Sequence, residues 1–509
     1  MTKWLPLSAT GRTLLGGTLL LTGVGFVCRM LGFLYRIFLS QTIGAEGLGI
    51  YNMVHPVYGV CFALCAGSIQ TALSQYIASH LDRGREIFYA GLMIALSFSV
   101  VFACLICKNA TFLANVVLKE PDCVPYLPYM GISVPFAAVH SCINGWYYGV
   151  RKSRVPAWSQ LAEQIIRMTI VFFFASCQIR EGRPITVSLA VFGHLVGEIA
   201  AAVFTFLCIL LCPPQPSRHM ARQSPSFFTD VAPLMHLALP LMGNRFIVNI
   251  LASMEAVWIP GCLRQYGMSS SQAFAVYGAL TGMALPFVYF PSAISNSLAV
   301  LLLPSVAQAQ AEGRHGSVRA SIALSLRYSM YMGILCIGIF LHFGASLGES
   351  VFHSRAAGQF IPVLAWICPF LYLASTLGSI LNGLGQTRTT FLLHVASLLL
   401  RIAFIRIGVP RHGIYACLCG MLAGEIVLAL TCLYCLNRFV PFSWNVREMI
   451  LKPSLILAAA FGSHQLLFSV LSVPSWIPLF IQTVLQIGLI CFVYAGLLLL
   501  FHLSRPAQQ

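Results

Sequence analysis

Charged side chains stand inside several long apolar runs of the sequence, where charges are rare. The run from Thr18 to Gly49 carries Arg29 and Arg36. They are seven positions apart, which places them on nearly the same stripe of a helix, roughly 10 Å apart along its axis. An arginine at the centre of a membrane-crossing helix costs about 2.5–3.5 kcal/mol to insert. Two on one stripe indicate a water-filled cavity or an anionic partner.

Later runs carry further polar and charged residues that could share this cavity. Arg245 lies far from either end of its run, so we expect it to remain inside the membrane. A guanidinium binds phosphate through two parallel hydrogen bonds. We therefore predict a basic cavity for an anionic, phosphate-bearing substrate. Its predicted lining residues are Arg29, Arg36, Arg245, Glu255, Asn249 and His55.

Two of these assignments have a simpler alternative. Arg36 is near the outer end of its run, so its long side chain could extend to the membrane interface. Glu255 could form a buried ion pair that holds the two halves of the protein together. In both cases the predicted cavity would rest mainly on Arg29 and Arg245.

Each half of the chain also carries an arginine and a glutamate in consecutive runs. These are Arg167 with Glu198, and Arg401 with Glu425. The simplest interpretation is a neutralising, structural ion pair inside each half. Glu163 is four residues before Arg167 and is an alternative partner on the same helix face. The functional alternative is a proton or cation site on one of the two later glutamates.

Composition identifies the kind of protein that must hold these residues. Of 509 residues, 58% are hydrophobic and 9% are charged, and the mean hydropathy is +0.83. Soluble proteins average about 25% charged residues. A membrane-crossing helix needs about 20 mainly apolar residues, and we count about 14 such runs. The sequence therefore predicts an all-α polytopic membrane protein.

The expected spans fix the order of the helices, with boundaries good to a few residues. They are 14–40, 50–78, 87–107, 124–149, 157–178, 186–212, 232–260, 273–302, 318–342, 358–384, 389–408, 412–436, 450–471 and 477–502. The net charge of +16 is spread over the loops, without the long basic tract that would indicate nucleic-acid binding. Lysine and arginine favour the loops that are cytoplasmic if both termini are inside.

Short motifs recur in the second half of the chain. Gly197-Glu198-Ile199 returns as Gly424-Glu425-Ile426, and Asn144-Gly145 returns as Asn382-Gly383. Their order and similar offset indicate a duplication of six-helix halves. The predicted domains are an N-terminal six-helix lobe (1–212), a cytoplasmic linker (213–231), a C-terminal six-helix lobe (232–437), and two additional helices with a tail (438–509).

The sequence offers no motif for enzymatic chemistry. It has no phosphate-binding loop, no nucleophile with a matching base and no metal-ligand spacing. The 18 cysteines lie mostly in apolar runs, without the pattern of a disulfide framework. We therefore expect neither catalysis, nor a metal, nor an organic cofactor.

Two segments resemble a known family. LTGVGFVCRMLGFLYRIFLSQTIGAEGLGIYNMVHPVY and LTGMALPFVYFPSAISNSLAVLLLPSVAQAQA are similar to the polysaccharide-transport, stage V sporulation protein B-like branch of the multidrug/oligosaccharidyl-lipid/polysaccharide (MOP) flippase superfamily. The resemblance implies two six-helix lobes around a central cavity, two further helices and alternating access. It also implies that Arg29 and Arg36 hold a lipid-linked pyrophosphate. Around Arg245 the match is poor.

The function that the resemblance implies is translocation of an undecaprenyl-pyrophosphate-linked saccharide. This would be lipid II or a related precursor of cell wall or spore cortex, moved across the bacterial cytoplasmic membrane. The implied partners are that substrate, membrane lipids and the cell-wall synthesis machinery, with coupling to an ion gradient or to the membrane potential. One alternative is a cation-coupled multidrug exporter of the same fold. Another is a non-transporting scaffold for septal or spore-coat assembly.

Overall fold

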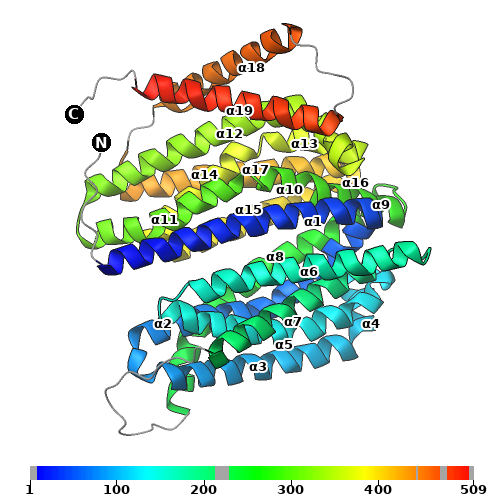
Figure 1. The fold of residues 1–509 in the computed structure, drawn as a ribbon, viewed down its shortest axis with the longest axis vertical. Coiled ribbons are helices and arrows are strands. Elements are labelled where there is room, and N and C mark those ends of the chain that lie inside the picture. Colours follow the sequence, from blue (N-terminus) through cyan, green and yellow to red (C-terminus); the bar gives the residue numbers. More distant parts are fainter. Residues whose placement is uncertain (1–8, 212–227, 443–444, 471–477, 504–509) are drawn as a thin grey trace. The chain divides into compact units, whose positions relative to one another are not determined.

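The computed structural model describes residues 9–211, 228–442, 445–470 and 478–503. These residues are almost entirely helical and contain no strand (Figure 1). Within them, 12 helices are long and apolar enough to cross a membrane, or 13 if a bent pair counts as one span. The predicted all-α polytopic membrane fold is therefore confirmed.

The chain divides into two compact units, Met1–Gly261 (unit 1) and Cys262–Gln509 (unit 2). The boundary falls inside helix α8 (Phe228–Gln265), one span later than the linker expected at 213–231. Residues 212–227 of that linker lie outside the described residues. The first part of α8 belongs to unit 1 because Leu234, Ala238 and Met242 are buried in its core.

Unit 1 contains the helices that later carry the candidate site. The α-helices are α1 (Ala9–Phe62), α2 (Ser68–Ser79), α3 (Gly84–Lys108), α4 (Ala110–Phe112), α5 (Leu127–Gly149), α6 (Arg154–Arg180), α7 (Val187–Leu211) and most of α8. Two π-helical turns, Ala63–Gly67 and Leu113–Leu118, and two 3₁₀ turns, Leu81–Arg83 and Pro121–Tyr126, connect them.

Helix α1 supplies two of the expected spans. Its 54 residues would measure about 80 Å if straight, whereas the hydrocarbon core is about 30 Å thick. The helix is interrupted at Gly44, where φ is 70° and ψ is −176°. Only glycine adopts such a conformation without strain. The break therefore separates the expected spans 14–40 and 50–78.

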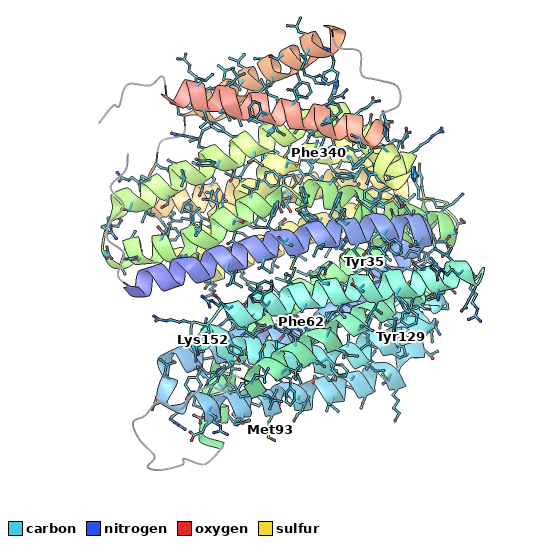
Figure 2. All side chains as sticks on the ribbon, viewed as in Figure 1. Tyr35, Phe62, Met93, Tyr129, Lys152 and Phe340 are labelled. Atoms are coloured by element: carbon cyan, nitrogen blue, oxygen red, sulfur yellow. The ribbon has the colours of Figure 1, made fainter. Side chains whose placement is uncertain are left out.

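The core of unit 1 lies between α2, α3, α5 and the start of α8. Ile69, Leu73 and Ile77 of α2 are fully buried there, and Trp146 of α5 packs edge-on against Phe88 of α3 at 5.8 Å. Helices α3, α5 and α7 lie side by side (Figure 1). Met93 of α3, by contrast, points outward and is exposed (Figure 2). These helices thus present apolar side chains both to the core and to lipid.

Unit 2 also consists of α-helices joined by short turns. Its α-helices are α9 (Ser270–Gly278), α10 (Leu285–Tyr289), α11 (Ser292–Ala311), α12 (His315–Phe352), α13 (Arg355–Ala365), α14 (Cys368–Gly383), α15 (Thr387–Ala403), α16 (Val409–His412), α17 (Ile414–Phe439), α18 (Lys452–Val470) and α19 (Leu479–Leu503). Its π-helical turns are Ala279–Ala284, Phe404–Gly408 and Arg447–Leu451. The core joins α11, α12, α14 and α17.

Two expected spans of unit 2 are interrupted. The span 273–302 is divided at residues 290–291, between Ser270–Tyr289 and Ser292–Ala311. The span 358–384 is bent by 58° between α13 and α14. Pro286, Pro362 and Pro369 lie in these segments and lack the amide hydrogen that a straight helix needs.

The last two helices pack against α12. Tyr494 of α19 donates a hydrogen bond to the carbonyl of Tyr331 at 3.1 Å, and Tyr331 donates one to the carbonyl of Glu448 at 3.3 Å. Phe492 of α19 is 79% exposed, as expected for a side chain that faces hydrocarbon.

Candidate functional site

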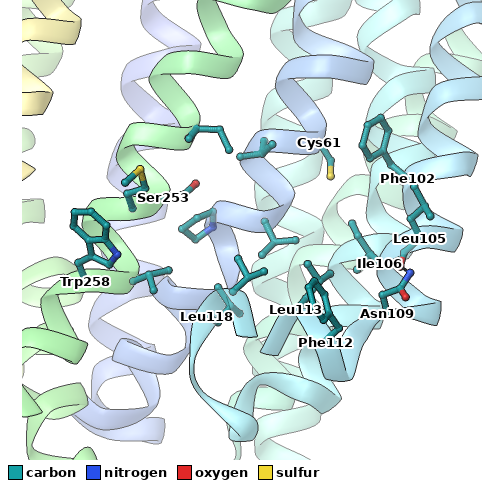
Figure 3. Close-up of a pocket in the computed structure, with 17 residues that line it drawn as sticks. Cys61, Phe102, Leu105, Ile106, Asn109, Phe112, Leu113, Leu118, Ser253 and Trp258 are labelled. Atoms are coloured by element: carbon teal, nitrogen blue, oxygen red, sulfur yellow. Dashed lines mark hydrogen bonds between the residues drawn. The ribbon is translucent and has the colours of Figure 1, made fainter. Parts of the chain in front are cut away.

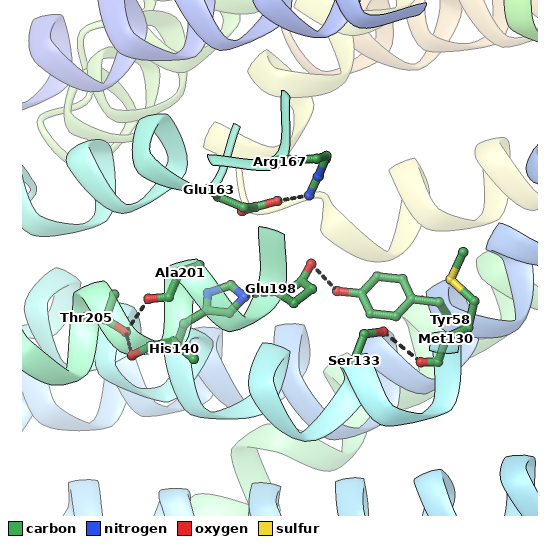
Figure 4. Close-up of polar contacts among 10 residues, drawn as sticks. Tyr58, Met130, Ser133, His140, Glu163, Arg167, Glu198, Ala201 and Thr205 are labelled. Carbon is green, nitrogen blue, oxygen red and sulfur yellow. Dashed lines mark hydrogen bonds and ion pairs between the residues drawn. The ribbon is translucent and has the colours of Figure 1, made fainter. Parts of the chain in front are cut away.

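A buried carboxylate on α7 is the centre of a polar cluster inside unit 1. Glu198 accepts a hydrogen bond from the Tyr58 hydroxyl of α1 at 2.8 Å. Its other oxygen lies 2.8 Å from Nε2 of His140, on α5 (Figure 4). Glu198 is only 4% exposed. Three helices therefore meet at one titratable group.

The arginine that the sequence assigned to Glu198 has another partner. Arg167 forms an ion pair with Glu163 on its own helix, α6 (Figure 4). The spacing of four residues places the two on one helix face, so Arg167 reaches Glu163 first. The expected Arg167–Glu198 pair is thus replaced by two pairs, Arg167–Glu163 and His140–Glu198.

The glycine before Glu198 explains how Arg167 fits. A Cβ atom at Gly197 would lie 2.7 Å from Nε of Arg167. The absence of a side chain at Gly197 therefore allows the guanidinium to pass α7.

Histidines extend the cluster along α1 and α7. The His194 ring lies 4.5 Å from the Tyr58 ring and 5.2 Å from the His55 ring, edge-on in both cases. His194 is buried, whereas His55 is exposed. His55, predicted to line the basic cavity, is thus part of the surroundings of Glu198.

A cavity of about 250 Å³ adjoins the cluster. Most of the side chains around it are polar. They are Tyr58, Phe62, Gln70, His140, Ser141, Asn144, Tyr148, Ser159, Gln160, Glu163 and Glu198. Glu198 lies at the buried part of the lining, whereas Gln160 is exposed. The cavity therefore connects the buried carboxylate with the surface.

Several buried polar atoms at this cavity have no hydrogen-bond partner among the described residues. They are Nδ1 of His140, Oγ of Ser141 and Oδ1 of Asn144. All three belong to one face of α5. Buried polar atoms are usually satisfied, so unpaired ones commonly mark a site where a ligand, water or proton binds.

The corresponding glutamate of unit 2 has different surroundings. Nη1 of Arg401 lies 3.8 Å from Oε1 of Glu425, and both side chains are largely buried. Gly424 again makes room, because a Cβ there would lie 2.7 Å from Cγ of Arg401. The adjoining cavity is only about 10 Å³. This cavity is too small to hold a ligand.

The residues predicted to form a basic cavity are spread along α1 and α8. Arg29 is exposed and forms no hydrogen bond or ion pair with any described residue. Nη2 of Arg245 donates to the hydroxyl of Thr71 at 2.9 Å, which ties α8 to α2. Asn249 donates to the carbonyl of Arg245 at 2.8 Å. The contacts of the described residues do not join Arg29 to Arg245.

Arg36 and Glu255 are less exposed than Arg29. Arg36 is half-buried, and Glu255 is buried with 7% of its surface exposed. Both take part in interactions within the protein. Of the predicted cavity residues, Arg29 is thus the one whose charged group is most open to a ligand.

A second, larger cavity in unit 1 is apolar. It measures about 550 Å³ and lies between α1, α3, the turn after α4, and α8 (Figure 3). Phe102, Leu105, Leu113 and Trp258 are among its lining residues. Such a lining fits a hydrocarbon chain rather than a saccharide or a phosphate.

Sequence reasoning did not single out His140, Tyr58 and His194. Each is one histidine or tyrosine in an apolar run, and such a residue gives no periodic signal. An available indication was position: His140 stands four residues before the repeated Asn144-Gly145. The described residues contain no group of three or more His, Cys, Asp or Glu arranged to hold a metal ion.

Comparisons with known proteins extend these observations. The chain matches the family described as "Polysaccharide biosynthesis protein" over residues 14–310. Stage V sporulation protein B of Bacillus subtilis (strain 168) is 25% identical over 460 residues, which cover 89% of this chain and 89% of that protein. The lipid II flippase MurJ of the same organism is 21% identical over 492 residues, covering 88% and 87%.

Solved structures show the same fold. A lipid II flippase MurJ in an inward closed conformation matches with a TM-score of 0.71 at 13% identity, over 95% of this chain and 99% of that one. An inward-facing multidrug resistance MATE family transporter of the MOP superfamily matches with a TM-score of 0.65 at 12% identity, over 81% and 94%. The likeness to these structures shows a shared fold.

Proposed function

The chain belongs to the polysaccharide biosynthesis protein family, in the flippase branch of the MOP superfamily, and on this premise we propose that it translocates an undecaprenyl-pyrophosphate-linked saccharide. The cargo would be lipid II or a related precursor of cell wall or spore cortex. The protein is a multi-pass protein of the cytoplasmic membrane. Translocation would proceed by alternating access.

The observation that carries the proposal is the state of Arg29. Its guanidinium is exposed on a membrane-crossing helix and has no acidic partner among the described residues. By contrast, Arg167 and Arg401 are neutralised by Glu163 and Glu425. An unneutralised arginine in a membrane is costly unless an anion binds it. A pyrophosphate supplies such an anion and accepts paired hydrogen bonds from guanidinium.

The apolar cavity of unit 1 supports the lipid part of the proposal. Its volume of about 550 Å³ and its apolar lining suit a segment of a polyprenyl chain. Cationic drugs, the cargo of a multidrug exporter, would instead need an unpaired acidic group near Arg29. Among the described residues, Arg29 forms no ion pair with a carboxylate. The flippase function is therefore favoured over the exporter with the same fold.

Further elements of the proposal concern the cellular setting. Both termini would be cytoplasmic, and an ion gradient or the membrane potential would drive the cycle. Enzymes of cell-wall synthesis would supply the cargo on one side and use it on the other. One curated relative is named as a flippase, and a solved flippase structure shares the fold, which supports transport without catalysis.

A binding experiment tests the proposal. The purified full-length protein in detergent is titrated with lipid II, and separately with a neutral glycolipid of the same chain length. We expect lipid II to bind at least tenfold more tightly. Arg29→Ala should weaken lipid II binding by about 10- to 100-fold, the worth of one or two charge-assisted hydrogen bonds.

The controls separate charge from folding. Arg29→Lys should retain part of the affinity, because it keeps the charge but loses the paired geometry. Arg180→Ala, which changes an exposed arginine in the last turn of α6, should bind like wild type. Equal binding of lipid II and the neutral glycolipid would overturn the proposal. Tight binding of a cationic dye with no lipid II binding would favour the exporter.

A further inference from the structure

The His140–Glu198 pair and the cavity beside it have no part in the proposed binding of the cargo. The side chains of the pair are 12% and 6% exposed, and the two groups lie 2.8 Å apart. The cavity of about 250 Å³ has the pair at its buried part and the exposed Gln160 in its lining. A buried titratable pair therefore communicates with one surface of unit 1.

The position of the cavity indicates which surface this is. Tyr148 and Ser159 line it, and they flank the turn between α5 and α6. From His140 to Tyr148 is eight residues, or about 12 Å along the helix. Lys152 belongs to that turn and marks this end of the helices (Figure 2). The cavity thus leads from the pair toward the end of unit 1 that carries the turn.

When His140 is neutral, no cation is in contact with the Glu198 carboxylate among the described residues. Glu163 and Glu198 both line the cavity, and Arg167 is paired with Glu163. Glu198 then remains a buried carboxylate without a cation in contact with it. Burying a carboxylate in this way inside a membrane is costly, and one added proton neutralises it.

No other charged group near the pair is in contact with the Glu198 carboxylate in the described part of the chain. The charged and titratable groups on this side of the four helices are Tyr35, Arg36, Tyr51, His55 and Tyr58 on α1, His140 and Tyr148 on α5, Glu163 and Arg167 on α6, and His194 and Glu198 on α7. Arg36 takes part in an interaction of its own. Among the described residues, only His140 and Tyr58 form hydrogen bonds with the Glu198 carboxylate.

The hydrogen-bond pattern shows where an added proton would be held. In the unprotonated pair, Nε2–H of neutral His140 donates to the Glu198 carboxylate, and Nδ1 has a free lone pair. After one proton binds, Nδ1 carries a hydrogen, whether the shared hydrogen lies on Nε2 or on the carboxyl oxygen. Nδ1 is the buried atom of His140 that has no hydrogen-bond partner in the described part of the chain. Oδ1 of Asn144, one turn along α5, is an unpaired acceptor on the same face.

We propose that the His140–Glu198 pair binds one proton, which enters through the cavity from the α5–α6 turn. The bound proton neutralises Glu198, and Asn144 accepts the new hydrogen of His140. Tyr58 holds the carboxylate and ties α1 to α7, so loading and release of the proton act on the contact between these helices. This proton site does not depend on the identity of the cargo.

The test uses the full-length protein in liposomes on a solid-supported membrane, without cargo. A pH jump from 8 to 6 should give a transient current in wild type as the site takes up protons. Glu198→Gln and His140→Gln should each lower the transferred charge at least tenfold, while gel filtration shows that both variants remain folded. The matched control replaces both members of the unit 2 pair, Arg401→Gln with Glu425→Gln, and should keep the full current.

Tyr58→Phe adds a test that distinguishes proton binding from a purely structural role of the pair. Its hydroxyl stabilises the carboxylate, so its loss should move the midpoint of the pH dependence up by roughly one pH unit. A full current in folded Glu198→Gln, or an unmoved midpoint in Tyr58→Phe, would overturn the proposal. A Glu198-dependent current on adding sodium at constant pH would do so too, since the site would then bind a metal cation. Cargo binding by Arg29 is measured separately, so the two proposals fail independently.

Discussion

Glu198 and Glu425 stand in the same Gly-Glu-Ile triplet, one in each unit, yet they have different partners. Glu425 faces Arg401, whose Nη1 lies 3.8 Å away. Glu198 is held by Tyr58 and His140 instead. In both units the glycine of the triplet lies against the arginine of the preceding helix. The two sites therefore share a framework and differ in which acid the arginine reaches.

A few residues account for this difference. Four residues before Arg167 is Glu163, and four before Arg401 is Ser397. Arg167 pairs with the acid on its own helix, whereas Arg401 has none there and turns to the neighbouring helix. Ser397 donates to the Gly424 carbonyl at 2.9 Å. Because Glu163, one helical turn before Arg167, pairs with this arginine, Glu198 does not form the ion pair that Glu425 forms in unit 2.

The histidine follows a similar pattern. His140 stands four residues before Asn144-Gly145, and the residue four before Asn382-Gly383 is Gly378. Unit 2 therefore has no side chain where unit 1 has the imidazole. One copy of the repeated motif thus holds its glutamate in an ion pair with arginine, whereas the other holds its glutamate against a histidine and a tyrosine.

The largest effect should come from breaking the pair in unit 2. Arg401→Ala leaves Glu425 buried without its partner, which should lower the free energy of unfolding by about 3–5 kcal/mol. Unfolding with sodium dodecyl sulfate, followed by intrinsic fluorescence, measures this loss. Adding Glu425→Gln should restore most of it. A loss below about 1 kcal/mol in Arg401→Ala would show that the pair of unit 2 is not structural.

A smaller effect should come from making unit 1 resemble unit 2. Glu163→Ser removes the partner of Arg167 and leaves this arginine to pair with Glu198, past Gly197. A nearby guanidinium stabilises the carboxylate, so the midpoint of the pH-jump current should fall by about 1–3 pH units. Glu163→Gln, which still accepts a hydrogen bond, should shift it less. An unchanged midpoint in Glu163→Ser would contradict the explanation of the difference between the units.

The sequence was sufficient for the architecture. A helix forms hydrogen bonds among its own backbone polar groups and can therefore cross the hydrocarbon region. Runs of about 20 apolar residues for this reason predict spans directly. The interruptions were harder to predict. Glycine or proline lies at or near the break at Gly44, the division at 290–291 and the 58° bend after α13, but other prolines of the chain, such as those of α8, lie inside continuous helices. The boundary between the units falls inside α8.

The site was only partly predictable. The repeated Gly-Glu-Ile triplet and the two arginines marked its framework, and the spacing of Glu163 and Arg167 already allowed the pair that forms. The partners of Glu198 could not be derived, because Tyr58 and His140 come from helices whose rotation the apolar pattern does not fix. Their roles, and that of Arg29 in cargo binding, stay predictions.

The most direct test of the proposed function is cargo translocation itself. Liposomes that contain the full-length protein are loaded with a fluorescent lipid II, and a membrane-impermeant quencher reports how fast inner-leaflet lipid reaches the outer leaflet. Wild type should equalise the leaflets at least tenfold faster than empty liposomes, and Arg29→Ala should fall to near the rate of empty liposomes while remaining folded. Wild-type translocation by Arg29→Ala, or no translocation by the wild-type protein, would contradict the account.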